Sequence, residues 1–284
     1  MVNKKYKDRL FCLLFGNEEY KENILSLYNA LCNTSYTNTD DIQIYTIEDV
    51  IYIKMKNDVS ILLDSFLYLW EQQSTFNPNM PIRGLLYFGK MYDKYITENH
   101  LNIYGKALIK LPTPKYTVLY NGMDEQPAFM QLRLSDSFIN PDTSGDFEWT
   151  ANMVNLNDGK NDDLLDKCQP LKEYMILINE IRKNSVSMGF EDAVDTAVTD
   201  CIEHNILKSF LLKHRAEVLD VCITEYNEKS FVDGIREEGR KEGRKEGQNL
   251  LATVVLRLRN GETPEQILAS GVDAKTIELA ETIK

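Results

Sequence analysis

Histidine is scarce in this chain, and its cysteines are not clustered. The 284 residues include three His (His100, His204 and His214), which are far apart, and five Cys, none of which forms a Cys-x-x-Cys pair. A structural zinc site or a disulfide framework is therefore not expected. Hydrophobic residues make up 43% of the chain, which is enough for a sizeable buried core.

Long apolar segments are also lacking. The apolar run at residues 11–15 is too short to cross a bilayer. The first residues do not contain the apolar stretch that a secretory signal peptide requires. We therefore expect a reducing, cytoplasmic location and no membrane partner.

Basic residues are outnumbered, with 32 Lys and Arg against 44 Asp and Glu and a net charge of −12. Nonspecific DNA affinity comes mostly from Lys and Arg on phosphates, so this balance counts against DNA as a partner. It does not exclude DNA, because charge can be distributed unevenly over a surface. Local basic residues occur at Lys4, Lys5, Lys7 and Arg9, and again at Lys106, Lys110 and Lys115. The simplest interpretation of these residues is a solvated surface.

Residues 57–74 carry the most informative pattern. Two runs rich in β-branched, aromatic and aliphatic residues flank Asp64-Ser65, which predicts a β-hairpin with a tight turn. One face then holds Val59, Ile61, Leu63, Phe66, Tyr68 and Trp70, and the other holds Leu62, Leu67 and Leu69. Strands that are apolar on both sides are typical of the centre of a sheet covered on both faces.

The same pairing brings two acids together. If Leu63 pairs with Phe66, then Asp58 faces Glu71 with Cβ atoms roughly 5 Å apart, and Gln73 shares their face. Facing like charges repel, so a cation between them is the simplest explanation, and Mg²⁺ takes oxygen ligands from one or two carboxylates. The alternative is a frayed hairpin end with solvated charges. A slip of one residue at the turn would separate the two acids.

Further elements are predicted around the hairpin. Asp8 is interpreted as the N-cap of a segment at 9–15, and Asn17 as the cap of a helix at 18–32. The segment 42–55 is rich in strand formers, and residues 116–120 predict a strand that ends at Asn121-Gly122. Pro81 suits the first turn of a helix. The apolar stripe expected on that helix consists of Ile82, Leu85, Leu86, Gly89, Tyr92 and Ile96.

This order of elements, with Asp58 followed by Glu71-x-Gln73, resembles the PD-(D/E)XK nuclease superfamily. More narrowly it resembles the Rpn group of recombination-promoting nucleases, also described as YhgA-like putative transposases. The matching segments are 8–11, 14–16, 56–60, 70–74, 77–84, 111–114 and 120–122. The resemblance implies an α/β fold, in which helices flank a mixed central sheet, with a helical C-terminal region.

The resemblance also implies a mechanism. Asp58 and Glu71 would be ligands of Mg²⁺, for which Mn²⁺ can substitute, and Gln73 would take the third catalytic position. That position is most often Lys, and a neutral amide can orient a water but cannot stabilise negative charge as an ammonium does. Arg83 would contact a phosphate with help from Tyr87. An ordinary pair on the helix surface is the simpler interpretation of these last two residues.

We expect four regions. These are a nuclease-like core at 1–160, a helical extension at 161–232, a charged Glu-Gly-Arg-Lys repeat connector at 233–248, and a small helical module at 249–284. Strands are expected at 129–134 and 147–156, and helices at 164–183, 189–212 and 214–228. Within the last module, Thr263-Pro264-Glu265-Gln266 predicts a helix start. Its charge pattern suits an accessory or oligomerisation module better than a sequence reader.

Two functional classes remain open. The first is a metal-dependent DNA endonuclease of the mobile-element type, which binds DNA weakly and without sequence preference and forms a homo-oligomer through its C-terminal helices. The second is a catalytically weak or inactive relative that acts as an interaction or regulatory module. The trio Asp58, Glu71 and Gln73 favours the first class. The acidic balance and the missing Lys favour the second.

Overall fold

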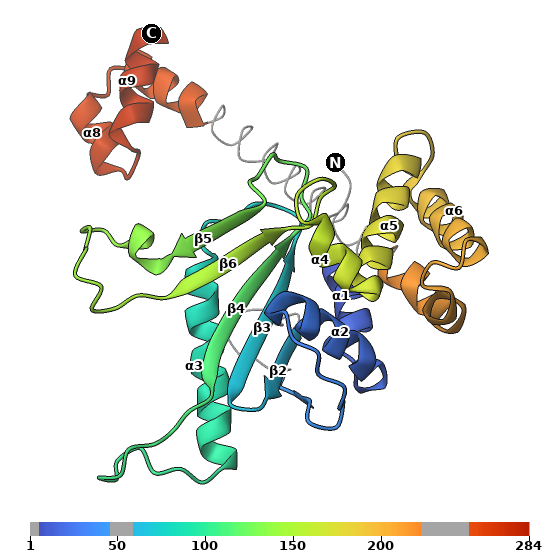
Figure 1. Cartoon of the computed structure of the whole chain (residues 1–284). Coiled ribbons are helices and arrows are strands. Elements are labelled where there is room, and N and C mark those ends of the chain that lie inside the picture. Colours follow the sequence, from blue (N-terminus) through green and yellow to red (C-terminus); the bar gives the residue numbers. More distant parts are fainter. Residues whose placement is uncertain (1–5, 46–58, 223–249, 284) are drawn as a thin grey trace. The chain divides into compact units, whose positions relative to one another are not determined.

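The computed structural model describes residues 6–45, 59–222 and 250–283. The chain divides into two compact units, Met1–Tyr226 and Asn227–Lys284 (Figure 1). Several predictions lie outside the described residues: those for Asp58, for Lys4 and Lys5, for the 46–55 part of the strand-rich segment, and for the connector at 233–248. None of the described helices combines the length and apolarity needed to cross a membrane.

The first unit is an α/β fold built on a six-stranded mixed sheet with the order β1-β2-β3-β4-β6-β5. Its strands are β1 (Gln43–Ile44), β2 (Val59–Leu63), β3 (Phe66–Gln73), β4 (Thr113–Tyr120), β5 (Phe129–Arg133) and β6 (Thr150–Asn155). The first three are antiparallel neighbours, β3–β4 and β4–β6 are parallel, and β5 returns antiparallel to β6. The prediction of a sheet flanked by helices is therefore confirmed at the level of fold class.

The hairpin forms in the predicted register. Leu63 pairs with Phe66, and Val59 pairs with Trp70. Asp64, the first turn residue, has φ 53°, a left-handed conformation that Asp and Asn tolerate better than most residues. The alternation of apolar side chains therefore falls on the two faces as expected.

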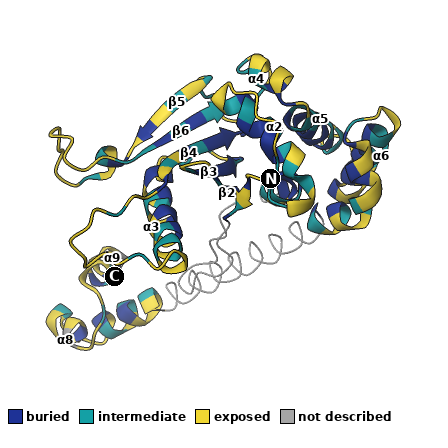
Figure 2. Cartoon of the chain, turned by 60° about the horizontal axis from the view of Figure 1, so that its bottom comes forward, coloured by how far each residue is buried: buried dark blue, intermediate teal, exposed yellow. Residues whose placement is uncertain are grey.

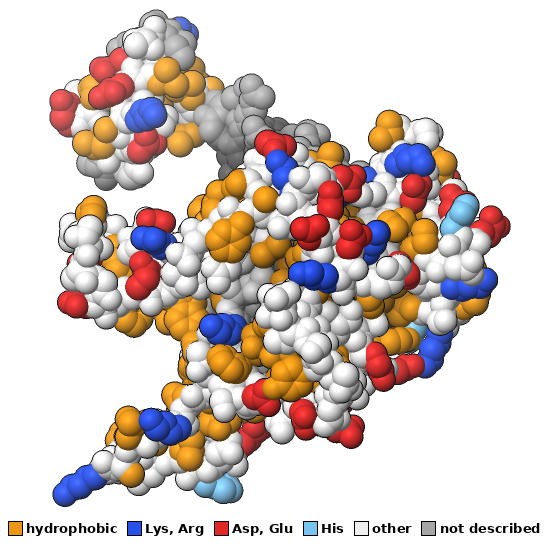
Figure 3. All heavy atoms as spheres, in the orientation of Figure 1, with side chains coloured by type: hydrophobic (Ala, Val, Ile, Leu, Met, Phe, Trp, Pro, Cys, Tyr) orange, Lys and Arg blue, Asp and Glu red, His pale blue; other side chains and the backbone are white. Residues whose placement is uncertain are grey.

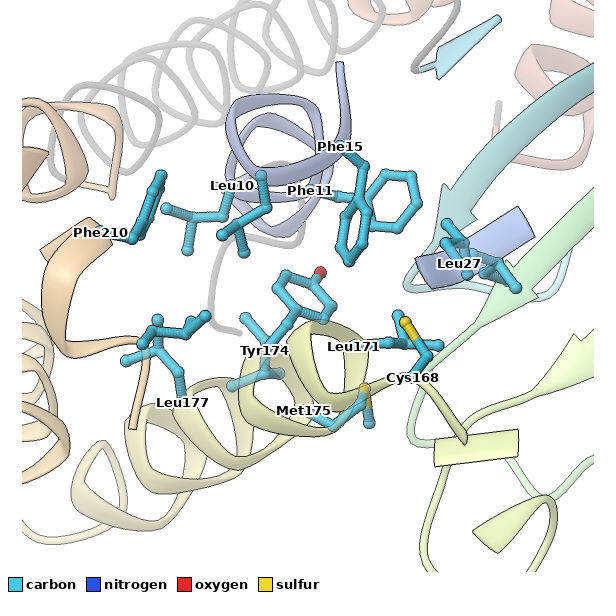
Figure 4. Packing of buried hydrophobic residues seen from close by; sticks show 14 of the residues in the cluster. Leu10, Phe11, Phe15, Leu27, Cys168, Leu171, Tyr174, Met175, Leu177 and Phe210 are labelled. Carbon is cyan, nitrogen blue, oxygen red and sulfur yellow. The ribbon is translucent and has the colours of Figure 1, made fainter. Parts of the chain in front are cut away.

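Helices cover both faces of the sheet, and each face has its own core. One face packs against α1 (Tyr6–Phe15), α2 (Lys21–Cys32), α4 (Asp162–Lys167), α5 (Gln169–Asn184) and α6 (Phe190–Glu203). Figure 4 shows Phe11 and Phe15 of α1 facing Leu171 and Tyr174 of α5. The other face packs against α3 (Met80–Glu98). The hairpin strands are buried between these two layers, as their two-sided apolar pattern predicts.

Helix α3 begins as predicted, with Pro81 in its first turn, but it presents a different face to the sheet. Its buried residues are Met80, Pro81, Gly84, Tyr87, Phe88 and Met91. Figure 2 shows that α3 carries both buried and exposed residues along its length. Ile82 is 37% exposed and Leu86 is 52% exposed, so the predicted stripe through these residues is wrong. The reason is that aromatic rings and a glycine, which permits close approach, fit the sheet surface better than the aliphatic stripe.

The N-terminal helices differ from expectation in their first turns. Asp8 lies inside the first turn of α1 and is not its N-cap, although an acid there still favours the helix dipole. Asn17 does act as a cap, but of the 3₁₀ turn Glu18–Tyr20, and α2 begins only at Lys21. Lys7, expected on a solvated surface, is 5% exposed.

The strands and helices after Gly122 follow the predicted order. β5 lies at the sheet edge, as expected for an extension of the sheet. The helix predicted over 164–183 is divided at Cys168 into α4 and α5. The helix predicted over 189–212 ends at Glu203, and residues 208–222 are again helical.

The second unit contains three short helical segments around a small core. They are residues 250–259, α8 (Pro264–Ala269) and α9 (Ala274–Ile283). Thr263 and Gln266 form the predicted capping box at the start of α8. The core consists of Val254, Leu258, Ile267, Ile277 and Ala280.

Candidate functional site: a buried glutamate between a strand and a helix

Glu71 is a fully buried acid near the carboxyl end of the central strand β3, with 0% of its surface exposed. It lies on the sheet face that packs against α3, together with Leu67 and Leu69. Ionised carboxylates are rarely buried without partners, because removing their charge from water costs several kcal/mol. The partners of Glu71 therefore define the site.

Two elements supply those partners. The phenol of Tyr116 on β4 donates a hydrogen bond to Oε2 of Glu71 at 2.9 Å. Nη2 of Arg83 on α3 donates to Oε1 at 3.4 Å, and the same nitrogen lies 3.3 Å from the Tyr87 hydroxyl. The longer ion pair and the shorter phenol bond indicate that Tyr116 holds the carboxylate more closely than Arg83 does.

Burial and charge act in opposite directions on this group. Burial raises the pKa of Glu71, while Arg83, Tyr116 and Tyr87 act to lower it. For Arg83, burial is the largest single influence and lowers the pKa of the guanidinium, but Glu71, Tyr87 and Tyr116 together outweigh burial and raise this pKa. The difference follows from exposure, because the side chain of Arg83 retains 27% of its surface and that of Glu71 retains none. Burial therefore decides the direction of the pKa shift at Glu71, whereas at Arg83 the surrounding partners together outweigh burial.

Arg83 and Tyr87 are not the ordinary helix-surface pair that the sequence favours. Tyr87 is 2% exposed, and Arg83 is half-buried beside Glu71. Gly84 makes this arrangement possible because a Cβ there would lie 2.6 Å from Cδ1 of Tyr116 and 2.9 Å from Nε1 of Trp149. The absence of a side chain at 84 lets α3 approach β4 closely enough for Arg83 to reach the carboxylate.

Of the other two predicted catalytic residues, the structure describes Gln73 but not Asp58. Gln73 is half-buried at the last position of β3, and strand alternation places it on the face of Glu71. Its backbone carbonyl accepts a hydrogen bond from the Asn121 amide at 3.0 Å. Asp58 precedes β2 and lies outside the described residues. The predicted pairing of Asp58 with Glu71 thus stays a prediction, although the register of β2–β3 is the one it requires.

The chemistry of Glu71 suits one ligand of Mg²⁺. A carboxylate offers roughly four lone-pair sites, so bonds from Arg83, Tyr116 and Tyr87 do not saturate it. Hard oxygen ligands are those that Mg²⁺ takes. Within residues 6–45, 59–222 and 250–283, no group of three or more His, Cys, Asp or Glu is arranged to hold a metal ion. Asp58, the second predicted metal ligand, lies outside these residues.

The opposite face of the same strand end carries a second polar group. Gln72 is fully buried and donates to Oδ1 of Asn121 at 2.7 Å. Asn121 also donates to Sδ of Met175, and its backbone carbonyl accepts from Arg182 on α5. The sequence identifies Asn121 only as a turn residue, whereas the structure buries it completely. These bonds fasten the ends of β3 and β4 to α5.

A separate hollow of about 700 Å³ lies beside β5 and the segment that leads to β6. Its polar lining includes Arg133, Asp136 and Glu148, and it shares no lining residue with the Glu71 cluster. This hollow is therefore separate from the Glu71 cluster.

Tyr116 is the site residue that sequence reasoning missed. Its contact with Glu71 depends on the parallel pairing of β3 with β4, in which Leu69 pairs with Tyr116. No local sequence pattern predicts that register, since a helix and a long loop separate the two strands.

No protein-family model matches the chain, and neither any curated protein nor any solved structure does.

Proposed function

We propose that this chain is a Mg²⁺-dependent DNA endonuclease of the mobile-element, recombination-promoting type, with a PD-(D/E)XK core. The observation that carries the proposal is Glu71, a fully buried acid at the end of a central strand whose hairpin register is the one predicted from the sequence. Strongly perturbed carboxylates of this kind concentrate at functional sites.

Each residue of the proposed site has a distinct task. Asp58 and Glu71 hold the metal, which when bound polarises a phosphoryl oxygen and lowers the pKa of its bound water. Gln73 orients the attacking water through its amide. Arg83 contacts a phosphate, and Tyr87, whose hydroxyl lies 3.3 Å from Nη2 of Arg83, keeps the guanidinium near the strand end.

A second candidate function has its own support. The net charge is −12, and both oxygens of Glu71 accept hydrogen bonds within the protein. These features favour a catalytically weak or inactive relative in which the Glu71–Arg83 pair fastens α3 to the sheet. In that case the chain would act as an interaction or regulatory module.

For both candidate functions we propose a homo-oligomer formed through the C-terminal helices. Light scattering on the purified protein tests this proposal.

A plasmid-nicking assay separates the two candidates. Supercoiled plasmid is incubated with the wild-type protein, with and without Mg²⁺ and with Mn²⁺. The variants are Asp58→Ala and Glu71→Gln, and the latter keeps the side-chain volume. We expect metal-dependent nicking in the wild type and a loss of at least about 100-fold in both variants, which is the scale of removing a catalytic group.

Glu125→Gln serves as the matched control, because that glutamate is 87% exposed and outside the site. It should nick as the wild type does. Circular dichroism of each variant establishes that lost activity is not lost folding. Nicking that survives both substitutions would remove the site assignment, and a wild type inactive with either metal would favour the interaction module.

A further inference from the structure

The loop between α3 and β4, residues 99–112, exposes apolar side chains that most loops would bury. Tyr104 is 93% exposed, Leu108 is 83% exposed and Ile103 is 56% exposed. Leu111 adds a fourth large apolar side chain, which is 42% exposed. Clustered exposed apolar residues in a soluble domain mark interaction surfaces.

The same loop has the opposite charge to the chain as a whole. It contains Lys106 and Lys110 and no Asp or Glu, while the whole chain carries a net charge of −12. Lys115, at the start of β4, is also exposed. Figure 3 shows blue and orange side chains together on the segment that extends below α3 in Figure 1. Glu98 precedes the loop at the end of α3, but within residues 99–112 the apolar side chains are accompanied by cations alone, which fits an anionic partner.

The base of this loop is fixed even though its tip is exposed. Tyr92 of α3 donates to the Pro112 carbonyl at 2.8 Å, and the Thr113 amide donates to the Ser65 carbonyl at 2.7 Å. At the other end, the Leu101 amide bonds the Ile96 carbonyl at 2.9 Å. The tip is therefore presented from a rigid support, which lowers the entropy cost of binding.

A line of cations along α3 connects this loop with the Glu71 site. Arg83, Lys90 and Lys94 are seven and four residues apart, so they lie on one side of the helix. Lys90 is exposed, whereas Lys94 is partly neutralised by Glu98 at 4.0 Å. The helical rise separates Arg83 from the loop by roughly 24 Å, which equals about seven base pairs of B-form DNA.

We propose that the 99–112 loop is a second DNA contact, which grips the same duplex as the Glu71 site about seven base pairs away. Lys106 and Lys110 bind phosphates, and Tyr104 packs against a base or sugar in the groove. This inference rests on the proposed function, because it takes DNA as the partner. An anionic membrane offers similar charge, but the cation line that runs from the loop to Arg83 favours an extended polyanion.

The test measures binding without cleavage. Fluorescence anisotropy follows a labelled duplex of roughly 20 base pairs in EDTA, over a range of salt concentrations. The variants are Lys106→Gln with Lys110→Gln, and Tyr104→Ser. The matched control is Lys183→Gln with Lys208→Gln, which removes the same charge from exposed lysines elsewhere in the first unit.

We expect the loop lysine variant to bind about tenfold more weakly and to reduce the salt slope by about 1.8, while the control remains close to the wild type. Tyr104→Ser should weaken binding without changing the slope. Equal binding by loop and control variants overturns the inference, as does a wild type that does not bind DNA. Loop-dependent binding to phosphatidylcholine–phosphatidylglycerol vesicles, with DNA binding unchanged, also overturns it. The nicking assay decides the proposed function independently of these results.

Discussion

A carboxylate without exposed surface depends on its few partners, and for Glu71 the only described cation among them is Arg83. We predict that Arg83→Gln lowers the free energy of unfolding by about 3 kcal/mol at neutral pH. Removing one member of a buried pair leaves the other charge uncompensated. The comparison is Arg133→Gln on the exposed edge strand β5, which should change stability by less than about 0.5 kcal/mol. Urea unfolding measures both.

The decrease in the free energy of unfolding of Arg83→Gln should become smaller as the pH falls. Burial raises the pKa of Glu71, and without Arg83 less remains to oppose that rise. A raised folded-state pKa contributes stability that is fully present below the ordinary glutamate value of about 4.3 and is lost as pH rises through the raised value. The difference from wild type should therefore shrink as pH falls from neutral towards about 4.5. A difference that is constant over this range would contradict the assignment.

Residue by residue, the sequence was informative where a local pattern existed. Glu71 stands out because it interrupts an apolar strand, and the hairpin turn fixes its face. Tyr116 could not be found in that way, because its role arises from a parallel pairing across a long connection. Tyr87 was expected on a surface, because its burial depends on how the whole helix is rotated.

At the scale of the element, two glycines in α3, Gly84 and Gly89, allow a matched comparison of the same substitution in a crowded and an open environment. A Cβ at Gly84 would press into the Tyr116 ring and against Trp149, whereas a Cβ at Gly89 would meet nothing within 4 Å. We predict that Gly84→Ala destabilises the fold by about 1–3 kcal/mol through overpacking. Gly89→Ala should stabilise it by roughly 0.5–1 kcal/mol, because alanine is the better helix former. Thermal unfolding of the two variants gives the comparison.

Whether Gly84→Ala lowers or raises the stability of the fold decides between the two interpretations of α3. Both substitutions gain the same helix propensity, so a stabilised Gly84→Ala would mean that α3 does not approach β4 as described. A destabilised Gly89→Ala would likewise contradict the open space beside that residue.

The elements themselves were predicted unequally. The hairpin was predicted with its register, because a tight turn and a two-residue alternation are both local. The start of α3 followed from Pro81, but its buried face did not follow from hydrophobicity. Both Leu86 and Phe88 are apolar, and only the sheet surface decides which one it buries.

At the scale of the whole molecule, the second unit has a core of its own. Ile267 is fully buried in that core, and its neighbour Leu268 is 51% exposed. We predict that Ile267→Ala lowers the free energy of unfolding of the second unit by about 2–5 kcal/mol. Because small units have little stability in excess, this loss should unfold it. Hydrogen exchange should then rise across residues 250–283 while the first unit keeps its protection. Leu268→Ala should leave both units protected.

Loss of hydrogen-exchange protection in the first unit of the Ile267→Ala variant would show that the two units unfold together.

The total charge of the molecule follows from the sequence, but the placement of its charged residues follows from the fold. Composition gives a net charge of −12, but only the folded chain shows Lys7 buried and Lys106 and Lys110 on one exposed loop.

The sequence by itself determined the hairpin, its two apolar faces, the position of Glu71 on the face of Leu67 and Leu69, and the order of helices and strands. Each of these depends on contacts between residues near one another in the chain. Only the tertiary structure decided that Tyr116 and Arg83 hold Glu71, that Asn121 is buried, and that α3 turns its aromatic side to the sheet. Those outcomes depend on packing between segments far apart in sequence, where many arrangements satisfy the same local pattern and shape complementarity selects one.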